Sequence, residues 1–414
     1  QAKAMVADSH SDGHHEVETH NTEEATHSNV DSKVSSDVHL EEDAHSSSHD
    51  EHLLHYLQNR PWSALYVAAL FFMFLSLGTL AFYAIQRASQ AGWSPLLFRV
   101  MEGITAYLLP GTLIILVILI LSSLHFNHLF VWMDPEVVAH DKIIQGKVGY
   151  LNSPFLIARA IFYIAGWNFY RYISRKYSLA QDNSSDISNH TKNFKWSAGF
   201  LAFFIVTESM MSWDWIMSVD PHWFSTLFGW YVFSEWAAIG FATILLITLY
   251  LKRLGYLENV NDSHIHDLGK WVFAFSLVWT YMWFSQFMLI WYSNIPEEVT
   301  YFTARLEVDN YRFLFWFSMI INFVVPVVLL MSRDAKRNNG RLIFVGCIIL
   351  LGHWLNSYLL VTPGTLGAHG HIGFTEIGMG LGFAGLFIYL VLNALTKQPL
   401  ETKNHPFLDE SKHL

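Results

Sequence analysis

Two glutamates, Glu208 and Glu235, lie deep inside long apolar stretches of this sequence. Each is about twelve residues from the end of its stretch, and a tight Asp-Pro-His turn at 220–222 joins the two stretches. Because consecutive helices joined by a short turn are usually neighbours, the two carboxyls are expected at a similar depth in adjacent helices. Two carboxylates in a low-dielectric setting cannot both ionise cheaply, so the pair is expected to hold about one proton. Such a pair suits a proton relay.

A second polar feature lies in a later apolar stretch. His353 and Asn356 are three residues apart and Ser357 follows, so the three side chains fall on one face of a helix at mid-depth. An imidazole changes its charge near neutral pH, which also suits proton transfer. A histidine in such a position is as often a structural hydrogen-bonding group, and that alternative stays open.

Arg159, Asp214 and Glu376 lie nearer to the ends of apolar stretches. An ionisable side chain in the middle of a membrane span costs at least about 2.5–3.5 kcal/mol on insertion scales, so each needs a partner or a function. Arg159 is the expected counter-charge of Asp214 or of Glu376, and a purely architectural ion pair is the alternative. The candidate proton path comprises Glu208, Glu235, His353, Asn356, Asp214, Arg159 and Glu376.

Long apolar stretches must position these side chains. Charged residues make up only 14% of the 414 residues, against about a quarter in a soluble domain. A stretch of about 20 apolar residues can cross a membrane, and inside hydrocarbon its backbone must be helical. Nine such stretches predict an all-α polytopic membrane protein: 62–86, 103–126, 153–171, 196–219, 223–251, 271–295, 313–331, 342–361 and 372–395.

The composition divides the chain into three parts. Residues 1–60 are rich in acidic residues and serine and hold ten histidines, which predicts a disordered, solvated segment, with weak metal capture as the alternative. Residues 61–397 are expected to form the transmembrane helical domain, and residues 398–414 a cytoplasmic tail. The chain begins at Gln1 instead of Met, so we expect its true start to lie upstream.

The distribution of lysine and arginine predicts the orientation. With the loops assigned alternately to the two faces, one face carries 17 of these residues and the other 7. Because cytoplasmic loops are enriched in lysine and arginine, the first face is predicted to be cytoplasmic. The histidine-rich segment and the loops near 127–152, 220–222, 296–312 and 362–371 then face the periplasm of a bacterium, with the chain in the inner membrane.

Cys347 is the single cysteine, and it lies inside an apolar stretch. The sequence therefore has no haem-attachment motif and no set of thiolates for an iron–sulfur cluster. A haem b would need facing histidines inside the membrane, and only His353 lies deep. We therefore expect haem and iron–sulfur clusters only in partner subunits.

Several long runs of residues are distinctive. They are WDWIMSVDPHWFSTLFGW (213–230), MWFSQFMLIWYSNIP (282–296), HWLNSY (353–358), and the QGK (145–147) and YLN (150–152) of one outer loop. These runs resemble the second quinone-binding membrane subunit of bacterial alternative complex III, which is of the NrfD/polysulfide-reductase type. The similarity covers nearly the whole membrane region.

The resemblance implies a quinol:cytochrome c oxidoreductase complex. Its other members would be multihaem and monohaem cytochrome c subunits, an iron–sulfur subunit and a paralogous NrfD-like membrane subunit. In this family the paralogue is the better candidate for quinol oxidation. The resemblance also implies ten transmembrane helices in the full-length protein, largely in two four-helix bundles, with one helix preceding Gln1. Whether this chain itself binds menaquinone or ubiquinone stays open.

The predicted function is that of a membrane subunit without redox centres in a respiratory quinol:electron-acceptor oxidoreductase. It would support quinol oxidation by its partners and contribute a proton path; nucleic acid is not an expected partner. One alternative is a purely structural scaffold of the same complex. The other is a stand-alone secondary transporter, whose site would need a pair of broken helices. Pro110 and Pro326 could break helices, but no corresponding pair of interrupted stretches is visible.

Overall fold

The computed structural model describes the backbone of residues 31–413 and the side chains of residues 58–413. Among the described residues, those from His55 onward form one compact unit, and those up to Leu54 belong to another. Within the described residues, all regular secondary structure is helical. The first unit is described only from Asp31, where helix α2 (Asp31–Ala88) begins.

In the described part of the segment predicted to be disordered, the backbone from Asp31 to Arg60 belongs to helix α2. This part contains neither glycine nor proline, the two residues that most disfavour a helix, and it includes the good helix formers leucine and glutamate. The expected disorder of residues 1–30, and the side chains of all ten histidines, lie outside what the structure describes.

Eight helical segments among the described residues are long and apolar enough to cross a membrane, so the chain is a multi-pass membrane protein. They are Gln58–Ala88 in α2, Pro95–Ser123 with α3 (Phe98–Ile104) and α4 (Leu108–Ser123), Ser188–Val219 with α8 (Ser188–Trp215), α9 (Phe228–Arg253), α10 (Asp262–Ser293), Asp309–Leu330 with α12 (Asp309–Met319) and α13 (Val325–Leu330), Asn339–His369 with α14 (Asn339–Leu366), and α15 (Phe374–Leu395). Each matches one of the predicted stretches.

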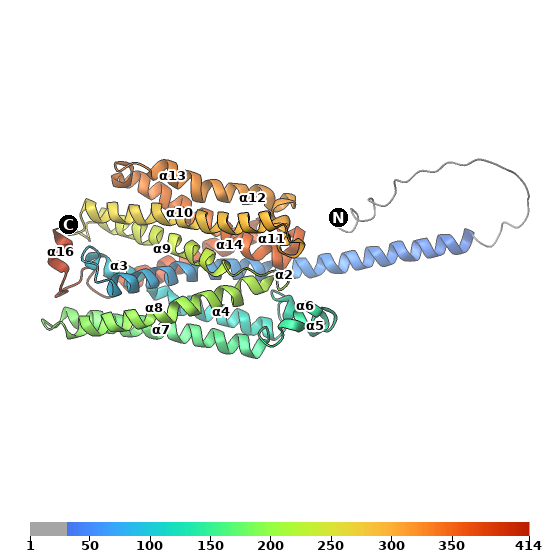
Figure 1. Ribbon diagram of the computed structural model, residues 1–414, viewed down its shortest axis with the longest axis horizontal. Coiled ribbons are helices and arrows are strands. Elements are labelled where there is room, and N and C mark those ends of the chain that lie inside the picture. The colour runs from blue at the N-terminus through green and yellow to red at the C-terminus, as the bar shows by residue number, and fades with distance from the viewer. Residues whose placement is uncertain (1–30, 414) are drawn as a thin grey trace, which may run out of the picture. The chain divides into compact units, whose positions relative to one another are not determined.

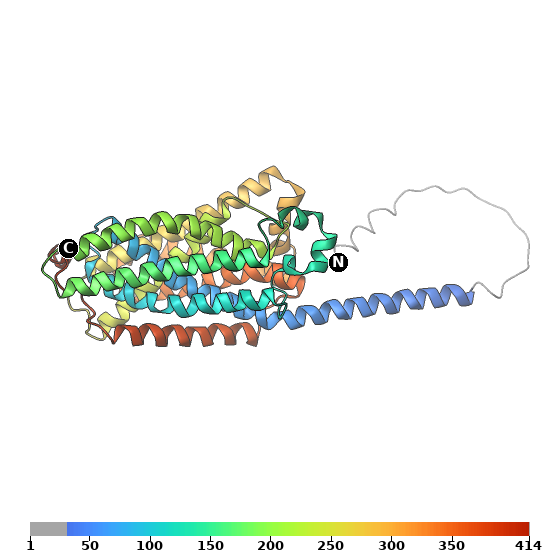
Figure 2. The same cartoon turned by 90° about the horizontal axis from the view of Figure 1, so that it is seen from below.

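The remaining predicted stretch, 153–171, lies in helix α7 (Ser153–Asp182). Its 30 residues span about 45 Å at the usual helical rise, which is long enough to cross a membrane. However, α7 carries several arginines and is less apolar than the other eight. It lies along α8 and against α4 (Figures 1 and 2).

Short helices lie at both ends of the long ones. At one end are α5 (Pro135–His140), α6 (Lys142–Lys147) and α11 (Pro296–Leu306), and at the other end is α16 (Leu408–Lys412) (Figure 1). The carboxylate of Asp141 caps α6 by accepting hydrogen bonds from the first backbone N–H groups of that helix.

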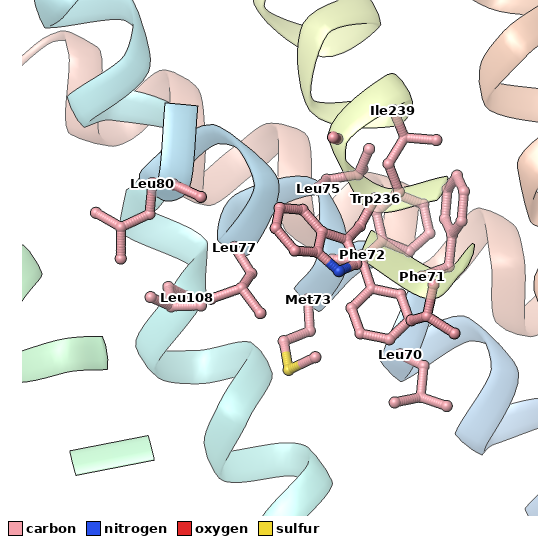
Figure 3. Close-up of a cluster of buried hydrophobic side chains, with 14 of the residues drawn as sticks. Leu70, Phe71, Phe72, Met73, Leu75, Leu77, Leu80, Leu108, Trp236 and Ile239 are labelled. Atoms are coloured by element: carbon pink, nitrogen blue, oxygen red, sulfur yellow. The ribbon is translucent and has the colours of Figure 1, made fainter. Parts of the chain in front are cut away.

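Helix α9 lies at the centre of the second unit, with α8, α10 and α14 as neighbours. It crosses α2 where Gly78 faces Gly240 and the backbone of Trp236, so closely that a side chain at either glycine would meet the other helix. Around this crossing, Figure 3 shows the leucine and phenylalanine side chains of α2 with Trp236 and Ile239 of α9. Small residues at such crossings let membrane helices approach closely.

The predicted cytoplasmic tail is docked on the ends of the long helices. Thr402 Oγ1 donates a hydrogen bond to Pro95 O at 3.1 Å, and the Lys403 backbone N–H donates to Asp182 Oδ1 at 2.8 Å. Farther along, Ser411 of α16 lies 3.1 Å from His264 Nε2. The tail is therefore held at three points against three different parts of the chain.

His405 lies between these points and is buried, with its ring against Phe98 and His190. Burial, and then the nearby positive charge of Arg87, lowers the pKa of His405 to about 2. The docked tail therefore keeps this imidazole neutral, whereas a detached tail would protonate it below its ordinary pKa of about 6.5.

Acid should therefore release the tail. Below about pH 6.5 only the detached form binds the proton, so docking weakens by up to about tenfold per pH unit. Limited proteolysis should cut the tail faster at about pH 5 than at neutral pH, and His405→Phe should remove most of this difference. The matched control is His413→Phe at an exposed position, which should keep the difference. Equal cleavage of the unmodified chain at both pH values would show that His405 does not control docking.

Candidate functional site

The Glu235 carboxyl lies fully buried between α9 and α14. Asn356 Nδ2 donates a hydrogen bond to Glu235 Oε2 at 2.8 Å, and Ser357 Oγ donates to Oε1 at 2.8 Å. Both oxygens of the acid are thus satisfied by the facing helix. A carboxyl in this setting is kept away from water and lipid, as an acid inside a membrane requires.

Tyr231, one turn before Glu235 in α9, extends these contacts. Its hydroxyl donates to Asn356 Oδ1 at 2.7 Å, so Asn356 connects the phenol to the acid. A cavity of about 10 Å³ borders Tyr231 and Asn356, and Arg305 and Ser318 line it too. Space of this size holds about one water molecule. We call Glu235, Tyr231, Asn356 and Ser357 the Glu235 network.

Arg305 supplies a buried positive charge beside this cavity. Its Nε donates to Leu359 O at 2.9 Å and its Nη1 to Tyr301 O at 2.6 Å, while the guanidinium carbon lies 3.5 Å from the centre of the Tyr301 ring. No carboxylate forms an ion pair with Arg305 in the described part of the chain. Arg305 is therefore held by carbonyls and an aromatic ring, with Tyr231 and Asn356 across the cavity.

Asn322 adds a further buried amide. It lies in the π-helical turn Ile320–Val324, and its Nδ2 donates to Ser318 Oγ at 3.2 Å. π-Helical turns occur frequently at functional sites, which makes this local irregularity a candidate functional feature. Ser318 lines the cavity, so the helix of α12 and α13 also contributes polar groups near it.

His353 is separate from these hydrogen bonds. The ring is fully buried and meets Trp279 of α10 edge to face, with the ring centres 5.2 Å apart. Within residues 58–413, neither ring nitrogen has a hydrogen-bond partner. The predicted polar stripe thus divides, because Asn356 and Ser357 contact Glu235 while His353 contacts α10.

Glu208 is buried in α8 but makes no hydrogen bond with Glu235 in the part of the chain that the structure describes, so the expected direct contact is not formed. Glu235 and Trp236 are consecutive in α9, so their side chains point about 100° apart. Trp236 is the one that packs on Phe204 of α8, with 5.3 Å between the ring centres. Glu235 therefore points to α14 instead. Ser209 Oγ lies 3.3 Å from Glu208 Oε2.

Arg159 pairs with Asp214, one of its two expected partners. Arg159 Nε and Nη2 each lie 2.8 Å from a different oxygen of Asp214, and the Tyr163 hydroxyl donates to the same carboxylate at 3.0 Å. The guanidinium carbon also lies 4.0 Å from the centre of the Tyr150 ring and 4.2 Å from that of the Phe155 ring. A bidentate pair with these extra contacts joins α7 firmly to α8.

Glu376, the other expected partner of Arg159, pairs with Arg60 instead. Arg60 Nε and Nη2 lie 2.8 and 2.9 Å from the two oxygens of Glu376, and the Gly373 backbone N–H donates to the same carboxylate at 2.7 Å. Arg60 belongs to the segment predicted to be disordered, so its pairing could not be anticipated. The interaction joins α2 to the first turn of α15.

An apolar groove of about 720 Å³ lies between α2, α9, α14 and α15. Its walls are almost wholly apolar. Its polar groups are the Thr243 hydroxyl, which already donates to Ile239 O in its own helix, the Tyr250 hydroxyl, and the indole N–H of Trp354, which has no partner among the described residues. The apolar lining fits an isoprenoid or acyl chain. No group of three potential metal ligands occurs among the residues described here.

The sequence singled out the acids but not all of their partners. Tyr231 is one helical turn from Glu235, and this spacing could have indicated it. Arg305 looked like an ordinary residue of an outer loop. Asn322 lies in an apolar stretch as Asn356 does, and only the π-helical turn distinguishes it.

The Glu235 network could hold and pass a proton. The Glu235 carboxyl can bind one proton. Asn356 and Tyr231 form a chain of hydrogen bonds from this carboxyl to the cavity, which is large enough for about one water molecule. By contrast, Asp214 and Glu376 each hold a bidentate arginine, which favours fixed charges over proton exchange.

A scan against models of known protein families finds no match for this chain, and a search of curated proteins finds none either.

Proposed function

We propose that this chain is an integral membrane subunit of a respiratory quinol:electron-acceptor oxidoreductase, similar to the second quinone-binding membrane subunit of alternative complex III. The observation that carries the proposal is the buried Glu235 network, supported by the distinctive sequence runs that include Asn356 and Ser357. Partner subunits hold the haem and iron–sulfur centres and oxidise the quinol. This chain provides a polar route for protons through its helices.

The proposal includes α7 as a ninth membrane span and a tenth span in the full-length protein. Neighbouring helices support two bundles. One comprises α4, α7 and α8 together with α2, whose Tyr66 and Arg87 side chains donate hydrogen bonds to α8 and α7, and the other comprises α9, α10, α12 with α13, and α14. The bidentate Arg159–Asp214 pair supports the membrane placement of α7, because it neutralises the outermost arginine of that helix.

Within this route, Glu235 takes and releases the proton. Tyr231 and Asn356 keep its hydrogen bonds continuous with the cavity, and Arg305 stabilises negative charge nearby. Glu208 on α8 and His353 on α14 are further buried ionisable groups of the proposed route, although neither is hydrogen-bonded to the Glu235 network among the described residues. Arg159–Asp214 and Arg60–Glu376 fix the helices around it.

A structural scaffold is the second candidate function, and the two bidentate ion pairs favour it. Both pairs join helices without any need for titration. The two candidates differ in one respect: a scaffold needs no ionisable group at Glu235.

The arginine- and lysine-rich face is proposed to be cytoplasmic, with the chain in the bacterial inner membrane. In a Cys347→Ser background, an impermeant thiol reagent applied to intact cells should label a cysteine introduced within 297–307. It should leave one introduced within 183–189 unlabelled. The reverse pattern would invert the proposed orientation.

Replacing Glu235 with glutamine should separate proton transfer from assembly. Glu235→Gln keeps the size and hydrogen bonding of the side chain but cannot take up a proton. In the purified complex we expect the variant to retain its cytochromes and to lose at least about tenfold in proton-coupled quinol turnover. Proton uptake and cytochrome reduction are measured together in vesicles.

The matched control is Glu297→Gln, which makes the same chemical change at an exposed position of α11. It should behave as the unmodified complex does. If Glu235→Gln assembles and keeps normal proton uptake and turnover, the scaffold function replaces the relay.

A further inference from the structure

At the end of the molecule where the tail docks, two arginines and two acids neutralise one another. Arg99 forms ion pairs with Glu102, at 2.6 Å, and with Asp182, and Arg87 lies 3.8 Å from the same Glu102. All four side chains are largely buried. This group of residues therefore has no net charge left to compensate other arginines.

Two further arginines lie beside this neutral group without a carboxylate of their own. Arg171 and Arg175 are four residues apart on α7, so their side chains share one face of the helix. Arg171 Nε donates to Thr105 Oγ1 at 3.3 Å, and Arg175 Nη1 lies 3.5 Å from Glu102 O. Within residues 58–413 neither forms an ion pair. Two adjacent like charges repel, so this arrangement calls for an anion.

The neutral contacts hold both guanidinium groups but leave most of their N–H groups free. Arg171 uses Nε and Arg175 uses Nη1, which leaves both Nη groups of Arg171 and the Nη2 of Arg175 without a partner among the described residues. Planar guanidinium groups of this kind match the paired oxygens of a phosphate group. Both side chains are partly exposed, so a phosphate can reach them.

An apolar stripe leads away from this position along α4. Leu109, Leu113, Val117 and Ile120 are exposed by 36% to 54% and follow Thr105 at helical spacing. From Leu109 to Ile120 the helix rises about 16 Å, close to half of a hydrocarbon core of about 30 Å. The stripe is therefore as long as one acyl chain in a single leaflet.

Exposed aromatic side chains lie close in sequence to the two arginines. Phe169 and Tyr172 flank Arg171 on α7, and the ring centre of Trp196 on α8 is 5.5 Å from that of Phe169. Aromatic residues gather where membrane helices meet the headgroup layer. This level in the membrane is where a lipid phosphate lies.

We propose that Arg171 and Arg175 bind the phosphate of an anionic phospholipid whose acyl chain lies along the exposed stripe of α4. Neither the pair Arg171 and Arg175 nor the apolar stripe of α4 would select a lipid alone. Together they offer a cationic pair at headgroup level and an apolar surface of acyl-chain length. None of the residues of this site belongs to the Glu235 network.

The test uses the full chain purified in detergent. It is titrated with dioleoyl phosphatidylglycerol and, in parallel, with dioleoyl phosphatidylcholine, and bound lipid is counted by native mass spectrometry. We expect the anionic lipid to bind at least about tenfold more tightly. The double variant Arg171→Gln/Arg175→Gln should lose this preference. The control Lys192→Gln/Lys195→Gln removes two exposed charges from the neighbouring helix α8 and should keep it.

Equal affinity of the unmodified chain for the two lipids would overturn the proposal without any variant. An arginine variant that keeps the full preference would do the same. Displacement of the lipid by an equal concentration of inorganic phosphate would show an anion site instead of a lipid site. Should the double glutamine variant fail to fold, the single variants Arg171→Gln and Arg175→Gln decide, because each removes one of the two charges. A reduced preference in either supports the site, and an unchanged preference in both contradicts it.

Discussion

A charge buried among membrane helices cannot be solvated by water or lipid, and this constraint governs the arrangement of the polar residues. Asp214 and Glu376 each receive two hydrogen bonds from an arginine on another helix. Removing one partner of such a pair would leave a buried charge without compensation, at a cost of about 3–5 kcal/mol. These pairs therefore tie α7 to α8 and α2 to α15, and helices that must be joined in this way have few alternative arrangements.

On helix α9, Glu235 lies on one face and the residues that pack against α8 and α2 lie on another. On one side Glu235 meets the amide and hydroxyl of α14. On the other side Trp236 and Gly240 fit against α8 and α2, where the close approach to Gly78 leaves no room for a side chain. Because these two faces are fixed by different neighbours, Glu235 is held in one position. A proton-binding group gains from such fixed hydrogen bonds, since little reorganisation accompanies transfer.

The apolar stretches could be predicted from the sequence because length and composition determine a membrane helix almost alone. The predicted stretch 372–395, for example, is α15 at Phe374–Leu395. Side-chain partners were harder, since helical spacing says which residues share a face but not which helix lies opposite. The expected contact between Glu208 and Glu235 is not formed for this reason. The hydrogen bonds to Glu235 come instead from α14, which is far along the chain. The contribution of Arg305 was missed because it follows from how α11 folds back onto α14.

The central claim is that this chain works inside a quinol-oxidising complex. The most direct measurement is purification from its native membrane through a tag on this chain, in mild detergent, followed by an absorbance spectrum and a quinol:cytochrome c assay of the same fraction. The account predicts c-type haem absorbance in fixed ratio to the chain, together with quinol-dependent reduction of cytochrome c. A homogeneous, haem-free chain with no such activity would contradict it.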